Sequence, residues 1–187
     1  GAPTLAESKM PAEVKEVITN ASALMDKSQF EDAATLLTQA KQQFPKNTIE
    51  LNGALARVHR SSAQQSNRDK KYEASAKAYA LAAEADPEDS VNWIDRGRAL
   101  REQARELSGS KNTTRRREVL ADAQKSFEKA IDLSPKTLSA WIGKAQVQEA
   151  RNNRTQAIDA YQQVVSIAPD SNEARLAKTA IDQLQKK

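Results

Sequence analysis

The chain of 187 residues is 39% hydrophobic and 29% charged, and it carries a formal net charge of +4. This length fits one domain or one short repeat array, and the apolar content excludes a disordered chain. The sequence has no Cys, which excludes disulfide bonds, thiol catalysis and the usual structural zinc sites. It also lacks a run of about 18 apolar residues, so we expect no membrane span.

The first ten residues have no helical period and lead into Pro11, a favourable first residue for a helix. We expect residues 1–10 to form a tether. Because the chain opens with Gly1-Ala2 rather than Met, we expect a trimmed chain or a mature form from which a targeting segment was removed. The sequence leaves the compartment open, since it fits the cytoplasm and the periplasm equally well.

Prolines divide most of the remaining chain into four segments, 14–47, 48–89, 90–137 and 138–171. Each segment has a proline two residues before its end: Pro45, Pro87, Pro135 and Pro169. Twelve positions before that proline lies a small residue: Ala33, Ser75, Ala123 and Ala157. Eight positions before that proline lies a bulky residue: Leu37, Tyr79, Phe127 and Tyr161. Small residues let two helices approach closely, and bulky residues fill the space beside them. Each segment is therefore predicted to form a helical hairpin.

The second and third segments are longer than the other two, and their extra residues fall between the two expected helices. We expect these two hairpins to protrude beyond the rest, with polar turns at 62–67 and 108–114. After Pro169, an apolar stripe that includes Ala174, Ala177 and Ile181 predicts one last helix over 172–185.

The segment 138–171 carries Trp141, Ala145, Ala157, Tyr161 and Pro169 at offsets that resemble the tetratricopeptide repeat (TPR), a helix-turn-helix unit of about 34 residues. The resemblance implies an all-α, right-handed α–α superhelix of about nine helices, with two hairpins extended by insertions. Residues 11–187 would then form one TPR-like domain of four units, closed by residues 172–185 as a capping helix.

The resemblance also implies where a partner binds, because the first helix of each TPR unit lines a concave groove. Carried over by position, the groove residues are Ile18, Asn52, Gly53, Val91, Ile94, Asp95, Arg98, Ile142, Gly143 and Gln146. The two glycines would leave room for a ligand. The alternative is that the isoleucines contact the neighbouring repeat.

Some TPR domains hold the C-terminal carboxylate of heat-shock chaperones with a clamp of Lys and Asn. The matching positions of this chain are Ile18, Ser22, Gly53, Val91 and Asp95. None of these residues fits the clamp, so we do not expect that subclass.

Catalysis is not expected. His59 is the only His and no Gly-rich turn accompanies it, so a nucleophile with its base is not indicated. The sequence has no Gly-rich phosphate loop, and its Asp and Glu residues are spread along helix faces rather than clustered. We expect neither a cofactor nor a metal.

Two basic clusters stand near the two expected protruding turns: Arg68, Lys70 and Lys71, and Arg115, Arg116 and Arg117. We expect both at the start of a second helix, where the helix dipole disfavours cations. Solvated tips are one interpretation, and contact with an acidic protein or with anionic lipid headgroups is the other. Nucleic acid is not expected, because no aromatic residues are interleaved with the basic ones.

The sequence thus predicts a non-catalytic protein–protein interaction module, a scaffold whose groove accepts an extended peptide or an amphipathic helix of a partner. One alternative is structural self-assembly into a homo-oligomer through the protruding hairpins or the end helices. Another is an adaptor that contacts acidic surfaces through the basic tips. The sequence does not identify the partner.

Overall fold

The computed structural model describes residues 10–186, so residues 1–9 of the predicted tether lie outside the described residues. Within this range the chain forms helices only, which confirms the all-α prediction. The helices are α1 (Ala12–Asp26), α2 (Phe30–Gln43), α3 (Thr48–Arg68), α4 (Tyr72–Ala85), α5 (Ser90–Glu106), α6 (Thr113–Leu133), α7 (Leu138–Ala150), α8 (Arg154–Ile167) and α9 (Asn172–Gln185). The division of the chain into four repeat units stays a prediction.

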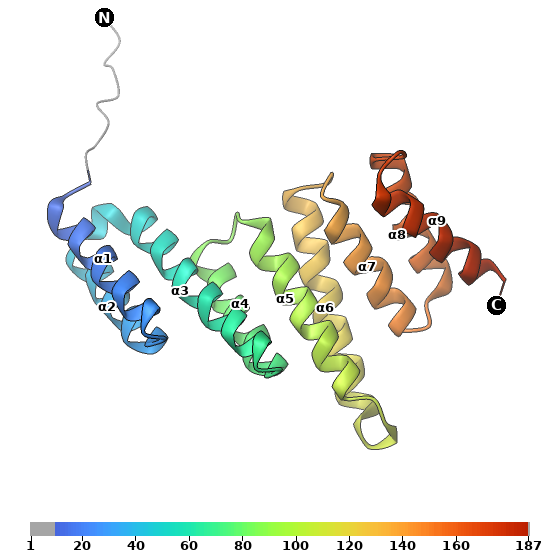
Figure 1. The fold of residues 1–187 in the computed structure, drawn as a ribbon, viewed down its shortest axis with the longest axis horizontal. Helices are drawn as coiled ribbons and strands as arrows, with labels where there is room; N and C mark the ends of the chain where they lie inside the picture. The colour runs from blue at the N-terminus through green and yellow to red at the C-terminus, as the bar shows by residue number, and fades with distance from the viewer. Residues whose placement is uncertain (1–9, 187) are drawn as a thin grey trace, which may run out of the picture.

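The helices stack side by side in chain order, with α1 at one end of an elongated molecule and α9 at the other (Figure 1). Each helix packs against the helix that follows it. In addition, α1 packs against α3, and α5 packs against α7. These contacts, together with hydrogen bonds from Arg60 of α3 to Asp89 and Asn92 at the start of α5, place α1, α3, α5 and α7 on one face of the stack, which we call the odd-helix face.

Three of the helix pairs are joined by the same tight turn, at 27–29, 69–71 and 151–153. Its middle residue has a positive φ in each case: 60° at Ser28, 57° at Lys70 and 61° at Asn152. The next N–H then donates to a carbonyl five residues back, over 2.8 Å from Lys71 to Ser66 and 2.9 Å in the other two turns. A left-handed residue at a helix end satisfies otherwise unpaired carbonyls in this way and reverses the chain.

The first insertion lengthens α3 without forming a loop. Residues 62–67, predicted as a polar turn, lie inside this helix of 21 residues, so that prediction was wrong. The Ser75 hydroxyl donates to the Ala63 carbonyl over 2.9 Å, and both residues are fully buried. This contact holds α4 against the second half of α3, right up to the ordinary turn at 69–71.

The second insertion lengthens both members of its pair. The helix α6 has 21 residues, and the connection to it contains a short 3-10 helix over Ser110–Asn112. Gly109 precedes that turn with a φ of 148°, a conformation that side chains disfavour. This end of the α5–α6 pair extends beyond its neighbours (Figure 1), as the sequence predicts.

The buried core follows the sequence pattern. All four small residues and all four bulky residues identified from the proline spacing are buried. The ring of Phe127 on α6 is fully buried and lies against Gly97 of α5 and Gly143 of α7. Alanine and glycine at such crossings let the helices approach closely, which explains a core with few large side chains.

Candidate functional site

The odd-helix face has a hollow of about 360 Å³ between α5 and α7, which we call the α5–α7 hollow. It brings together four of the predicted groove residues: Arg98, Ile142, Gly143 and Gln146. The other lining residues, which family position does not predict, are Arg101, Leu138, Ser139 and Glu173. Arg101 follows Arg98 by about one helical turn, and this spacing on one face could have identified it.

The α5–α7 hollow combines apolar side chains with guanidinium groups. Arg98 Nη1 lies 3.1 Å from a carboxylate oxygen of Asp95, and the side chain of Arg98 stays 52% exposed. Arg101 pairs with Glu102 over 3.4 Å and also donates to the side-chain oxygen of Gln146. Burial raises the pKa of Asp95, and the guanidinium of Arg98 opposes that rise. The hollow therefore presents oriented hydrogen-bond donors beside the apolar side chains of Leu138 and Ile142.

A second hollow, of about 560 Å³, lies between α1 and α3 on the same face. We call it the α1–α3 hollow. It contains the predicted residues Ile18 and Gly53, together with Lys15 and Arg57. A Cβ added at Gly53 would meet nothing within 4 Å, so the space expected beside this glycine is present.

Two of the groove predictions are wrong in their physical role. Ile94 is only 4% exposed and belongs to the same buried cluster as Ala63 of α3 and Tyr79 of α4. Ile94 is therefore a core residue. Ala63, which belongs to the same cluster, lies in the lengthened part of α3. Gly143 leaves no room for a ligand above its Cα, because an added Cβ would overlap the ring of Phe127.

The remaining predicted groove residues line neither hollow. Val91 is 46% exposed at the start of α5, and Asp95 is half-buried beside Arg98. Asn52 is half-buried on α3, and its side-chain oxygen has no hydrogen-bond partner. Whether any of these residues contacts a partner stays a prediction.

The two basic clusters lie in different settings. Arg68 is the last residue of α3, so the prediction that it lies at the start of a helix was wrong, whereas Lys70 lies in the turn and Lys71 is the N-cap of α4. A cation at the C-terminal end of a helix interacts favourably with the helix dipole. Arg115, Arg116 and Arg117 do lie near the start of α6, where the dipole opposes them.

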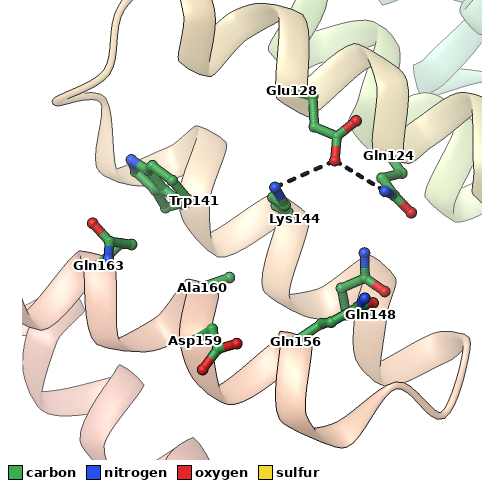
Figure 2. A pocket seen from close by; sticks show the side chains of 9 residues that line it. All are labelled: Gln124, Glu128, Trp141, Lys144, Gln148, Gln156, Asp159, Ala160 and Gln163. Carbon is green, nitrogen blue, oxygen red and sulfur yellow. Dashed lines mark hydrogen bonds and ion pairs between the residues drawn. The ribbon is translucent and has the colours of Figure 1, made fainter.

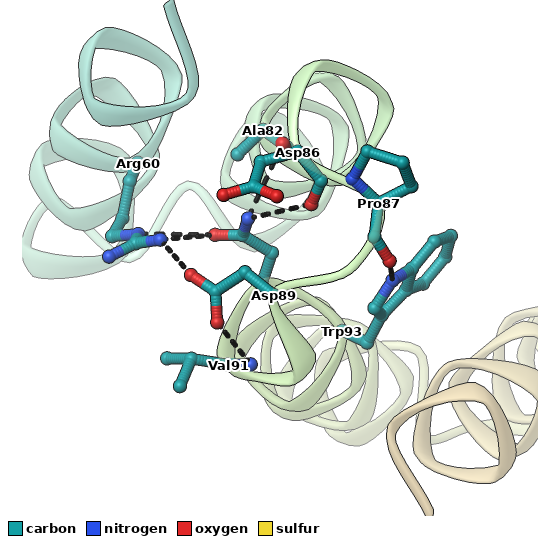
Figure 3. Close-up of polar contacts among 8 residues, drawn as sticks. Arg60, Ala82, Asp86, Pro87, Asp89, Val91 and Trp93 are labelled. Atoms are coloured by element: carbon teal, nitrogen blue, oxygen red, sulfur yellow. Dashed lines mark hydrogen bonds and ion pairs between the residues drawn. The ribbon is translucent and has the colours of Figure 1, made fainter. Parts of the chain in front are cut away.

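A polar network joins α3 to α5 beside the odd-helix face (Figure 3). Arg60 donates to Asp89 over 2.5 Å and to the side-chain oxygen of Asn92 over 2.9 and 3.1 Å. Asn92 is fully buried, and its amide group donates to the carbonyls of Ala82 and Asp86 over 3.4 Å. The network therefore holds α3, α4 and α5 in a fixed arrangement.

A third hollow, of about 270 Å³, lies between α6, α7 and α8 (Figure 2). The indole N–H of Trp141 donates to the Pro135 carbonyl over 2.8 Å, which fixes the ring. Lys144 lies 5.7 Å from the centre of that ring and 3.3 Å from a carboxylate oxygen of Glu128. Lys144 and Glu128, two of the three charged side chains that line this hollow, are thus already paired with each other.

Metal binding and membrane insertion have no support in the described part of the chain. Residues 10–186 contain no group of three or more His, Cys, Asp or Glu side chains that could hold a metal ion. Among the helices of this range, none combines the length and the apolar character needed to cross a lipid bilayer.

Stacked antiparallel helix pairs define a helical-repeat protein. Residues 115–172 match the model of the tetratricopeptide repeat family. The TPR domain of Arabidopsis OM64 has a TM-score of 0.58 at 15% identity, covering 72% of this chain and 98% of that domain. Residues 115–172 therefore carry tetratricopeptide repeat sequence, and the described chain shares the fold of TPR domains.

Two further solved structures share the fold. The second TPR domain of human RPAP3, in complex with the HSP70 peptide SGPTIEEVD, has a TM-score of 0.55 at 16% identity, covering 71% of this chain and 99% of that chain. TTC0263, a TPR protein of Thermus thermophilus, has a TM-score of 0.54 at 16% identity, covering 91% of this chain and 80% of that chain. No curated protein matches this chain.

Proposed function

We propose that this protein is a non-catalytic interaction module that binds a segment of a partner protein along the odd-helix face. The observation that carries the proposal is the α5–α7 hollow, where Arg98 and Arg101 stand beside Leu138 and Ile142. Apolar pockets with a few oriented polar groups are the usual design of a peptide-binding groove.

The charges of the two hollows indicate the chemistry of the segment. The α5–α7 hollow contains two arginines, and the α1–α3 hollow contains Lys15 and Arg57. The lining of each hollow has two cations and one carboxylate, Glu173 or Glu50, and Arg98 and Arg101 also contact Asp95 and Glu102 beside the α5–α7 hollow. We infer that the partner segment carries acidic residues between apolar ones, because acidic groups would pair with these cations.

The human RPAP3 domain gives a precedent for a peptide bound to this fold. The positions that match the chaperone clamp hold Ile18, Ser22, Gly53, Val91 and Asp95 in this chain. None supplies a Lys or Asn side chain, so we propose that this protein does not hold a terminal carboxylate through that clamp.

Selection of peptides from a random library on the purified protein tests the proposal. We expect the selected peptides to be enriched in Asp and Glu, and amide shifts on adding one of them to fall on α5 and α7. Shifts confined to α6 and α8 would place the binding surface elsewhere. Sedimentation at several concentrations separates the proposal from self-assembly, because a defined oligomer without peptide binding would favour assembly.

A further inference from the structure

The start of α6 and the α7–α8 turn enclose a hollow of about 280 Å³ that the groove proposal does not use. Three arginines line it: Arg116 and Arg117 from α6, and Arg151 from the turn. Asn152 and Asn153 complete the rim. None of the described residues that line this arginine hollow is acidic, in contrast to the two hollows of the odd-helix face.

Internal contacts orient these arginines without neutralising them. Arg116 donates to the Ala150 carbonyl over 3.2 Å, and Arg151 donates to the side-chain oxygen of Gln124. Both acceptors are uncharged. Within the described residues, none of the three arginines pairs with a carboxylate, whereas the adjacent Arg115 faces both Glu73 and Glu118.

A guanidinium has five N–H donors, so two oriented arginines and the unpaired Arg117 keep most of their donors for a ligand. The positive end of the α6 dipole adds to the positive electrostatic potential of the arginines. Without an anion, the repulsion among these positive charges is unfavourable. The arginine hollow is therefore arranged for a group with high negative charge and several acceptor oxygens.

We propose that the arginine hollow binds the phosphate monoester of a phosphorylated side chain on a partner protein. A phosphoserine or phosphothreonine carries a charge of about −1.5 to −2 near neutral pH and offers three acceptor oxygens. Arginine pairs with phosphate through two parallel hydrogen bonds, which a single carboxylate allows for only one of the three arginines.

The shape of the site favours a single phosphate group over a membrane surface. The arginine hollow is a recess between α6 and the α7–α8 turn, and the carboxylates beside Arg115 interrupt the positive surface next to it. A bilayer would instead need a broad basic face. In the part of the chain that the structure describes, the lining of the recess contains no aromatic residue, so stacking with a nucleic-acid base is not indicated.

Nuclear magnetic resonance of the full chain tests this proposal with three probes at constant ionic strength. These are N-acetyl-O-phosphoserine amide, N-acetylglutamic acid amide and phosphatidylserine vesicles. We expect the phosphoserine probe to shift the amide signals of residues 115–117 and 151–153 saturably, and more tightly than the glutamate probe. Binding should weaken from about pH 7 to about pH 5, because the second phosphate pKa is near 6.

Arg117→Gln is the key variant, because within the described residues this side chain has no hydrogen bond or ion pair to lose. It should weaken binding of the phosphoserine probe by roughly tenfold. Lys129→Gln removes the same charge from an exposed site on the same helix and should leave binding unchanged. The pair Arg98→Ala with Arg101→Ala should also leave it unchanged, which separates this site from the groove.

Three results would overturn the proposal. The first is the absence of saturable shifts around the arginine hollow, and the second is an equal loss of binding in Arg117→Gln and Lys129→Gln. The third is binding to the vesicles without any response to the phosphoserine probe, which would assign the arginines to a membrane surface.

Discussion

At the scale of single residues, Gly53 and Gly143 differ in the space beside them, since one faces open space and the other a packed aromatic ring. Gly143 lies against the ring of Phe127, and an added Cβ at Gly97 would come within 2.8 Å of the same ring. Gly53 faces open space in the middle of α3. The sequence predicts room for a ligand at both Gly53 and Gly143. It cannot distinguish the two glycines, because it does not show which residue packs above each of them.

The pair Gly143→Ala and Gly53→Ala measures this difference. Gly143→Ala should lower the free energy of unfolding by roughly 1–3 kcal/mol, because the added methyl group overlaps a ring that cannot move freely in a packed core. Gly53→Ala should raise it by about 0.5–1 kcal/mol, since alanine is the better helix former. Urea unfolding compares the two, and a neutral Gly143→Ala would contradict the packing described for Phe127.

His59 makes stability depend on pH. Burial lowers the pKa of His59 because it disfavours the charged imidazolium, and Glu84 only partly opposes this effect. The unfolded chain therefore binds a proton at His59 more readily than the folded chain does. Stability should fall as the pH drops below about 6.5, the ordinary pKa of His.

The comparison of the native chain with His59→Gln isolates that contribution. Between about pH 7.5 and about pH 5.5, the urea midpoint of the native chain should decrease more than that of the variant. Equal decreases would show that His59 does not titrate differently in the folded and unfolded states.

At the scale of helices, the proline spacing predicts most of the architecture. The small and bulky residues that it identifies are buried, and α9 spans Asn172–Gln185 as a last helix. The same spacing does not show which helix takes up an insertion. The hydrogen bond from Ser75 to Ala63 shows that α3 takes up the first insertion, and Ala63 belongs to the same buried cluster as Ile94.

The network around Asn92 should stabilise the junction of α3 and α5. Asn92→Ala should lower the free energy of unfolding by roughly 1–3 kcal/mol, because it removes a fully buried amide that accepts from Arg60 and donates to the carbonyls of Ala82 and Asp86. Lys77→Ala removes an exposed ion pair with Glu73 and should change it by less than about 1 kcal/mol. Thermal or urea unfolding measures the stability of both variants. Similar losses of stability in the two variants would mean that the network around Asn92 stabilises the fold no more than an exposed ion pair does.

At the scale of the whole molecule, the odd-helix face is a property that no single segment shows. The α5–α7 hollow needs side chains from α5, α7 and α9, and the arginine hollow needs the α7–α8 turn beside the start of α6. The sequence predicts Arg98, Ile142 and Gln146 as groove residues through family position. It does not predict Arg101 or the recess at Arg151, because both depend on how neighbouring pairs pack.

Binding of a library-selected peptide to two double variants tests the groove most directly. Arg98→Ala with Arg101→Ala should weaken binding at least roughly tenfold, because it removes the donors that face the segment. Lys125→Ala with Lys129→Ala removes the same charge from exposed positions of α6 and should bind normally. Fluorescence anisotropy gives the affinities, and circular dichroism confirms that both variants stay helical. Normal binding by the Arg98 and Arg101 variant, with loss in the α6 variant, would contradict a partner site on the odd-helix face.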